Sequence, residues 1–229
     1  MQSKREKGER VMILTIEREC GSAAHEVAEE LAEIYGLELF DKERMIAKAK
    51  ELGIYEEVEK FFEERPMKSM YPVGENGEAP EFGKAIFERL RDLTGGTGFV
   101  VIGRCGNYIF RNYPEVVSVF LHAEVKDRVS RTMMKQGLDR WSAGKLIDEV
   151  DDKRRRFYKF YTGRVWDQAS DYDLCINTSH TGIDGAVQLI QSYIETKLGD
   201  GNQRPKPVTS EDMDLFLGDP VSMDIYRFQ

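Results

Sequence analysis

The chain has 229 residues, of which 41% are hydrophobic and 32% are charged, a balance that allows a sizeable core and excludes global disorder. Its formal net charge of −8 argues against general binding of nucleic acid polymers, and its longest apolar runs fall far short of the roughly 18 residues of a membrane-spanning helix. Three cysteines without a CxxC pair suggest neither a disulfide framework nor a zinc site. We therefore expect a cytoplasmic protein without a membrane partner.

The first forty residues predict the start of a parallel sheet. Residues 1–10 are charged but lack the apolar stretch of a signal peptide, and we expect them to be disordered. Residues 11–16 form a short apolar, β-branched run typical of a buried strand, and residues 37–40 form a second one. Between them, residues 25–35 carry apolar side chains at helical spacing, and Gly36 follows as a helix-ending residue. This order indicates a βαβ unit.

The rest of the chain continues the alternation of helices and strands. Residues 42–93 are expected to form a mostly helical insertion with a Pro/Gly-rich loop in its middle. Further strands are expected at 99–103, 117–121 and 172–177, and helices at 124–136, at 143–161 and from Thr181 to about 198, where Thr181 and Asp184 have the spacing of a capping box. Five short strands alternating with helices predict an α/β fold, a three-layer sandwich around a five-stranded parallel sheet.

The carboxyl ends of these strands are the expected ligand edge, because ligands of open parallel sheets bind there. This rule selects residues 17–25, Asp41, residues 103–106 and residues 177–180. In the first of these loops, the N-terminus of a helix would offer free backbone N–H groups to an anion. An ordinary loop between a strand and a helix would look the same, because Gly21 alone supplies the backbone freedom of glycine.

Residues 124–164 are basic within an otherwise acidic chain. They hold 12 Lys/Arg against 7 Asp/Glu, and such an island can attract a small polyanion. The four consecutive basic residues 153–156 point around most of one helical turn, so two of them are expected to face a site. Arg128 and Arg131 are three residues apart and share a face. The alternative interpretation is a solvated helix pair with interleaved charges.

Several segments resemble the cytidylate kinase-like family, which belongs with the P-loop nucleoside-monophosphate kinases. The matching segments are LTIERECGS (14–22), LELFDKE (37–43), VVIGRCG (100–106), KRRRFY (153–158), YTG (161–163) with Trp166, and YDLCINTS (172–179). They occur in the family's order and span roughly residues 11–197. The resemblance implies the architecture of those kinases, with residues 42–93 as an acceptor-binding insertion and about 137–166 as a basic lid. It also implies ATP as phosphate donor, Mg²⁺, and nucleotides as substrates.

The resemblance implies a degenerate phosphate loop. Its residues would be Cys20, Gly21, Ser22, Ala23, Ala24, His25 and Glu26. The family's relatives with the motif GxxxxGK have glycines where Arg18 and Ala23 stand and a lysine where Ala24 stands. That lysine normally bridges the transferred phosphates, so its absence requires compensation by other cations. Glu26 would repel phosphate unless Mg²⁺ lies between them, which makes it the candidate metal ligand.

Roles for the remaining site residues are also implied by the resemblance. The acceptor would be bound by Asp41 and Arg104, and the base would lie against Asn177, Thr178 and Ser179. The lid would contribute Arg128, Arg131, Lys153, Arg154, Arg155 and Arg156, and catalysis would depend on Arg18, Arg104, Arg154 and Arg155. Each role has a structural alternative: Asp41 can cap a helix, Arg104 can form a surface ion pair, and Ser179 can cap the last helix.

Three functional hypotheses remain open from the sequence. The first is an ATP- and Mg²⁺-dependent kinase that transfers phosphate to a nucleoside monophosphate or a similar small acceptor, with arginines neutralising the transferred group. The second is a catalytically weak or inactive nucleotide-binding regulatory protein, which the missing loop lysine favours. The third is a kinase for an acceptor that is not a nucleotide.

Residues 199–229 lie outside the resemblance. They begin as a polar, Pro-containing linker and end with scattered apolar side chains. Because exposed apolar groups on a free tail are a liability, we expect this segment to dock on its own domain or in a homodimer. The alternative is a disordered tail.

Overall fold

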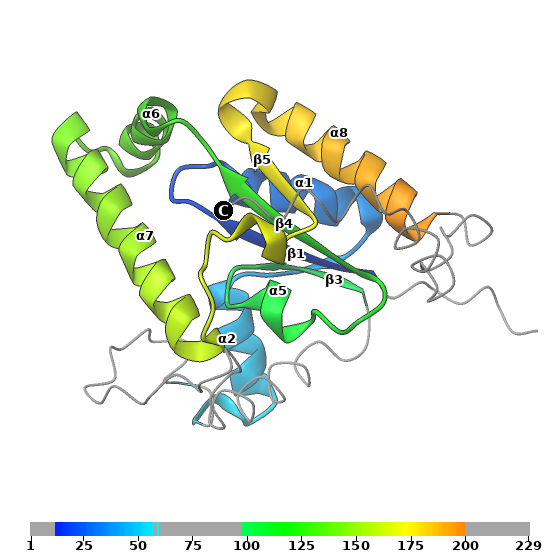
Figure 1. Cartoon of the computed structure of the whole chain (residues 1–229). Coiled ribbons are helices and arrows are strands. Elements are labelled where there is room, and N and C mark those ends of the chain that lie inside the picture. The colour runs from blue at the N-terminus through cyan, green and yellow to red at the C-terminus, as the bar shows by residue number, and fades with distance from the viewer. Residues whose placement is uncertain (1–11, 57–58, 60–97, 200–229) are drawn as a thin grey trace, which may run out of the picture. The chain divides into compact units, whose positions relative to one another are not determined.

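The computed structural model describes residues 12–56, 59 and 98–199 (Figure 1). The expectations for residues 1–10, for most of the insertion at 42–93 and for the tail after Gly199 fall outside these residues. The chain divides into two compact units, Met1–Gln191 and Ser192–Gln229, and the sheet and site described below lie in the first. Among the described residues, no helix is long and apolar enough to cross a membrane.

A five-stranded sheet with all neighbours parallel forms the centre of the first unit, which confirms the predicted fold class. Its strands are β1 (Ile13–Arg18), β2 (Glu38–Phe40), β3 (Phe99–Ile102), β4 (Val116–His122) and β5 (Leu174–Asn177), in the spatial order β2-β3-β1-β4-β5. β1 lies in the middle, where Ile13 pairs with Phe99 on one side and with Val116 on the other. The apolar character of β1 follows from this central position, because both of its faces are covered.

The helices cover the sheet in the predicted order. They are α1 (Ala24–Tyr35), α2 (Lys42–Glu51), the short α5 (Gly106–Ile109), α6 (Val125–Gln136), α7 (Arg140–Thr162) and α8 (Thr178–Leu198), with a 3₁₀ turn η1 at Ala169–Asp171. Gly36 ends α1 in the left-handed conformation, as expected. α7 begins three residues before the predicted start because the Asp139 carboxylate accepts hydrogen bonds from the N–H groups of Trp141 and Ser142.

Two local predictions need correction. α5 was not expected, and it follows three consecutive residues in the left-handed region: Gly103, Arg104 and Cys105. The last helix begins at Thr178 rather than at the Thr181 capping box, and Gly182 breaks its helical geometry. The Thr181 hydroxyl donates instead to the carbonyls of Asn177 and Gly182.

An aromatic core packs against the sheet. It joins the strands to α2, α5 and α7 through side chains that include Phe99, Phe110, Tyr158 and Trp166. The rings meet edge to face: the Phe99 and Phe110 centroids are 5.0 Å apart, and those of Phe120 and Trp166 are 5.3 Å apart. α1 packs against β1, β2 and β3 without joining this cluster, so the sheet lies between two helical layers.

Candidate functional site

The loop between β1 and α1 is held by its carbonyl groups. Three arginine side chains and one hydroxyl donate to carbonyl oxygens at and after the end of β1: Arg154 to Arg18 at 3.0 Å, Arg128 to Cys20 at 2.8 Å, Arg131 to Gly21 at 3.1 Å, and Thr178 to Ser22 at 2.9 Å. These donors come from α6, α7 and the start of α8. Side chains of three helices thus fix the course of the loop backbone.

Four N–H groups of this loop and of the first turn of α1 have no hydrogen-bond partner within the described part of the chain: those of Gly21, Ala23, Ala24 and His25. Gly21 and Ala23 have positive φ angles of 79° and 61°, which curl the backbone around these groups. The loop borders a pocket of about 800 Å³ that also reaches Arg131, Lys135 and Arg154. Free N–H groups, a helix N-terminus and neighbouring cations are the features of an anion site.

An ionic cluster formed by Glu19, Arg128 and Asp151 supports the loop between β1 and α1 through hydrogen bonds to the Cys20 backbone. Arg128 is 5% exposed, and it pairs with Asp151 and lies 3.2 Å from a carboxylate oxygen of Glu19. Asp151 also accepts the N–H of Cys20 at 2.8 Å. Arg128, expected in the lid, thus lines neither of the two pockets and supports the loop between β1 and α1. Sequence reasoning missed Glu19 and Asp151, because the contacts that tie them to the loop, Glu19 with Arg128 and Asp151 with the Cys20 N–H, join residues more than a hundred positions apart.

A second, smaller pocket of about 190 Å³ lies beside the loop. Its wall is formed by Glu17, Arg18, Arg104, Cys105, Val150, Lys153, Arg154, Phe157, Tyr158 and Trp166. Arg104 follows β3 directly, as expected, and its guanidinium carbon lies 5.4 Å from the centre of the Phe157 ring. Within the described part of the chain, Lys153 makes no hydrogen bond or ion pair. Four cations against one carboxylate make this pocket attractive to a small anion.

Arg18 and Arg154 line both pockets and so mark the place where they meet. Arg18 depends on Gly103, because a Cβ atom at Gly103 would lie 1.9 Å from Nη1 of Arg18. Any side chain there would displace the guanidinium. The glycine that the resemblance placed before Arg104 is therefore explained by the passage of Arg18 across the end of β3.

Glu17 is a buried carboxylate in the wall of the small pocket, and sequence reasoning missed it. One of its oxygens, Oε2, accepts a hydrogen bond from Trp166 Nε1 at 3.0 Å, and Nη1 of Arg18 lies 4.0 Å away. The other oxygen, Oε1, has no hydrogen-bond partner among the described residues. Burial, with Glu17 adding negative charge, holds the pKa of the neighbouring Cys105 thiol well above its ordinary value.

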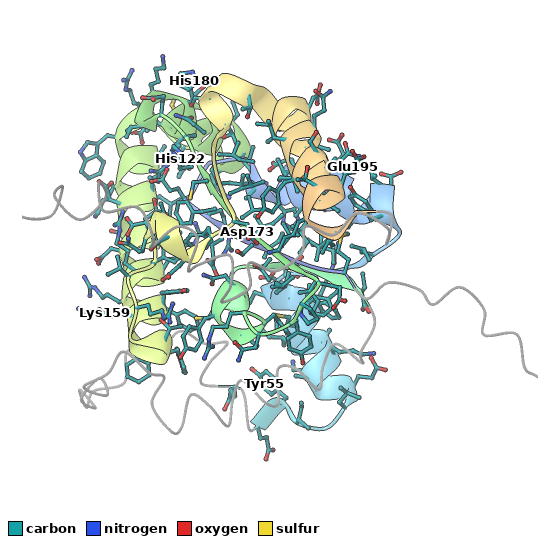
Figure 2. All side chains as sticks on the ribbon, turned by 45° about the vertical axis from the view of Figure 1, so that its right-hand side comes forward. Tyr55, His122, Lys159, Asp173, His180 and Glu195 are labelled. Carbon is teal, nitrogen blue, oxygen red and sulfur yellow. The ribbon has the colours of Figure 1, made fainter. Side chains whose placement is uncertain are left out.

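The four consecutive basic residues of α7, 153–156, separate into two pairs. Lys153 and Arg154 line the small pocket, whereas Arg155 lies 3.7 Å from Asp167 and Arg156 forms an exposed pair with Asp152. Further along α7, Lys159 lies on the outer side of the helix (Figure 2). Of the two lid arginines expected to be catalytic, the structure thus places Arg154 at the site and Arg155 beside it.

His25 and Glu26 lie on the wall of the large pocket in the first turn of α1. His25 Nε2 is 3.2 Å from Glu29, in an exposed i,i+4 pair. Glu26 lies 3.0 Å from Lys135 Nζ. Partial burial opposes ionisation of Glu26, but hydrogen bonds from its own N–H and from Lys135 lower its pKa overall, so it is charged at neutral pH.

The remaining predicted residues make structural contacts. Asp41 caps α2 by accepting the N–H of Arg44 at 2.8 Å. Asn177 accepts the N–H of Ser179, and the Ser179 hydroxyl accepts the N–H of Glu124. These residues do not line the two pockets described above. Thr178, which donates to the Ser22 carbonyl and accepts from Arg131, does not line them either.

Comparisons with known proteins agree with this geometry. The chain is 25% identical over 186 residues to a cytidylate kinase from Thermococcus kodakarensis, which covers 80% of this chain and 88% of the relative. It is 28% identical over 193 residues to a cytidylate kinase from Archaeoglobus fulgidus, covering 81% and 96%. The crystal structure of an uncharacterized protein from Eubacterium ventriosum superposes with a TM-score of 0.61 at 28% identity, covering 81% of this chain and 99% of that one.

The family model that matches is the cytidylate kinase-like family, over residues 13–180. This range contains the small pocket, all of the large pocket's lining except Ile183, the loop between β1 and α1, and the basic residues of α7. The chain belongs to the cytidylate kinase-like family.

Proposed function

We propose that this protein transfers a phosphoryl group from ATP, with Mg²⁺, to a nucleoside monophosphate or a similar small anionic acceptor. One observation supports the proposal: the large pocket, bordered by the free N–H groups of the loop, and the small pocket, lined by four cations, share Arg18 and Arg154 in their walls. The ATP phosphates would occupy the larger pocket at the N–H groups of residues 21–25. The acceptor would occupy the smaller pocket, with its anionic group on Arg104 and Lys153.

In this arrangement Arg18 and Arg154 take the place of the missing loop lysine. Phosphoryl transfer requires positioned positive charge around the transferred group and little covalent chemistry from the protein. Arg154 donates to the Arg18 carbonyl and lies 3.4 Å from Asp151, so its guanidinium is held in place before any ligand arrives. Prepositioned cations need no reorganisation during the reaction.

Glu26 is the candidate ligand for Mg²⁺ in this proposal. The described residues contain no cluster of three or more His, Cys, Asp or Glu side chains that could hold a metal ion by themselves. Mg²⁺ in kinases is commonly held by one or two carboxylates together with substrate phosphates, so a single ionised carboxylate beside the loop fits. The ion would neutralise phosphate charge, and Lys135 would continue to position Glu26.

The regulatory alternative is favoured by Ala24, which lines the large pocket and stands where authentic cytidylate kinases have the loop lysine. Two measurements on the full chain separate the alternatives. Mg²⁺–ATP should raise the melting temperature, and ³¹P NMR should then show ADP and a phosphorylated product from a panel of nucleoside monophosphates. Binding without product would support a regulatory protein, and absence of ATP binding would contradict both.

Cytoplasmic location and the homodimer remain proposals as well. The apolar segment expected to dock lies after Gly199, outside the described residues, and its test is the size of the protein in solution with and without residues 200–229. Loss of a dimer on truncation is the expected result; an unchanged size would contradict it.

A further inference from the structure

Lys135, near the end of α6, is a cation in the wall of the large pocket. It lines that pocket together with the loop between β1 and α1, and its Nζ atom lies 3.0 Å from Oε1 of Glu26. It does not line the small pocket, whereas Arg18 and Arg154 line both pockets. Lys135 is therefore placed to act on a ligand of the large pocket alone.

One face of α6 follows the loop from its start to the first turn of α1. Arg131 and Lys135 are four residues apart, so their side chains leave the helix on the same face. Arg131 donates to the Gly21 carbonyl, and Lys135 donates to Glu26, five residues further along the chain. The stretch between these two contacts, residues 22–25, carries three of the four N–H groups that have no partner in the described part of the chain.

The two cations on this face differ in how many of their donors the protein uses. Both terminal nitrogens of Arg131 donate to Thr178. The ammonium group of Lys135 has three N–H donors, and the hydrogen bond to Glu26 uses one of them. Because this pair is exposed, a ligand can reach the other donors without breaking it. Glu26 also holds a long side chain in place, which lowers the rotamer entropy that Lys135 loses when it binds a ligand.

This arrangement suits the phosphates of a nucleotide donor that are not transferred. A lysine ammonium group binds phosphate oxygens as a compact point charge. In the proposed function the transferred phosphate lies at Arg18 and Arg154, and the rest of the phosphate chain extends into the large pocket, which Lys135 lines. Ala24, at the position of the absent loop lysine, lines the same pocket. Lys135 thus brings a lysine to this pocket from α6 rather than from the loop.

We propose that Lys135 binds the phosphates that remain with the nucleotide after transfer, and that Glu26 positions it for this role. The inference rests on the proposed function for the identity of the donor, but it concerns the binding of a polyphosphate chain by one residue outside the loop. The ligand is a nucleoside di- or triphosphate, and Lys135 recognises its polyphosphate chain. Arg18 and Arg154 then serve the transferred group, and Lys135 serves the leaving group.

Calorimetric titration of the full chain with Mg²⁺–ADP, Mg²⁺–tripolyphosphate and CMP tests the proposal. Lys135→Ala should weaken binding of ADP and of tripolyphosphate by a similar factor, roughly tenfold, because a charge-assisted contact to phosphate is lost. CMP, as a candidate ligand of the small pocket, should bind as it does to the wild type. Lys135→Arg keeps the positive charge and should recover most of the lost affinity.

Lys145→Ala is the matched control. Lys145 has the same exposed fraction as Lys135, 61%, and it forms the same kind of exposed pair, with Glu149, but it lines neither pocket. We expect this variant to change each affinity by less than about twofold. Equal losses in the two alanine variants would overturn the inference, and so would unchanged binding of tripolyphosphate by Lys135→Ala. A loss in Lys135→Ala that is as large for CMP as for ADP would indicate a structural role instead.

The outcomes separate this inference from the proposed function. A wild type that forms product, while Lys135→Ala binds ADP normally, refutes the role of Lys135 and leaves phosphoryl transfer standing. Binding of ADP and tripolyphosphate that depends on Lys135, without product from any nucleoside monophosphate, refutes the kinase and leaves the inference standing. A wild type that binds neither polyphosphate ligand contradicts both. Both lysines are exposed helical residues, where alanine is a good helix former, so the variants are expected to fold, which circular dichroism checks.

Discussion

Ala23 adopts a backbone conformation that residues other than glycine rarely take. Its φ of 61° and ψ of 25° place it in the left-handed region at the residue that precedes α1. For a residue with a Cβ atom this costs about 1 kcal/mol, because the Cβ crowds the following carbonyl. The curved path of the loop, which sets the direction of its N–H groups, therefore carries backbone strain at Ala23. A glycine at this position would relieve that strain.

We expect Ala23→Gly to stabilise the protein by about 0.5–1 kcal/mol, since relief of the strain outweighs the added freedom of the unfolded chain. Urea unfolding measures the change. Ala28→Gly, in the middle of α1 at a buried helical position, is the control and should destabilise instead. A loss of stability in both variants would show that Ala23 is not strained.

Arg104 is expected to matter more to the acceptor than Lys153 does. Its position is fixed by the end of β3 and by Phe157, whereas Lys153 is an exposed side chain on a helix. Arg104→Ala should weaken acceptor binding by about 1.5–3 kcal/mol, the value of a charge-assisted hydrogen bond. Calorimetry or KM values would show this, with Arg156→Ala as the control for loss of a distant positive charge. A larger effect of Lys153→Ala would reverse the two roles.

At the scale of elements, Asp151 connects α7 to the loop between β1 and α1. It is 3% exposed and serves Arg128, Arg154 and the Cys20 N–H at once. Its neighbour Asp152 forms only an exposed pair with Arg156. Asp151 and Asp152 thus form the same type of interaction, an ion pair with arginine, once in a buried and once in an exposed environment.

Asp151→Ala should destabilise the protein by about 3–5 kcal/mol, because it removes the buried partner of Arg128 and leaves only the partly exposed Glu19 beside this buried charge. Asp152→Ala should change stability by less than about 1 kcal/mol. Denaturant unfolding of the two variants gives the comparison. Similar values for both would mean that the buried cluster does not hold the loop.

The elements could be predicted from the sequence because their signals are local. Apolar runs predict all five strands, and helical spacing together with Gly36 predicts the main helices. The edge of the sheet where a ligand is expected follows from the parallel arrangement of the strands. The left-handed stretch at Gly103–Cys105 and the capping at Thr178 could not be predicted, because they depend on tertiary contacts such as the passage of Arg18 over Gly103. For the same reason the site was predicted in part: Arg104 and Arg154 follow motifs, whereas Glu17, Glu19 and Asp151 gain their roles only from distant partners.

At the scale of the whole molecule, the alkylation rates of the three cysteines can report on both folding and ligand binding. Cys175 is exposed, Cys20 is partly buried at the wall of the large pocket, and Cys105 is buried. Burial raises the pKa of all three thiols, which reduces the reactive thiolate at neutral pH, and raising the pH from 7 towards 9 should therefore accelerate alkylation.

We expect iodoacetamide to modify Cys175 first, Cys20 more slowly, and Cys105 only on unfolding. Mg²⁺–ATP should protect Cys20 and leave the rate at Cys175 unchanged, because only Cys20 lines the proposed phosphate site. Mass spectrometry of the alkylated peptides measures each rate. Equal protection of Cys20 and Cys175 would point to a global change rather than to occupancy of the loop.

The central place of β1 has a consequence for how the chain is made. This strand is synthesised first, yet both of its neighbours come much later, since Ile13 pairs with Phe99 and Val116. On the ribosome, residues 13–18 must wait until β3 and β4 have emerged before they can take their place in the sheet. Their apolar side chains stay exposed during that time, and closing such long loops slows folding. Release from the ribosome before β4 is complete would leave β1, the strand that leads into the loop at the large pocket, unpaired on the β4 side.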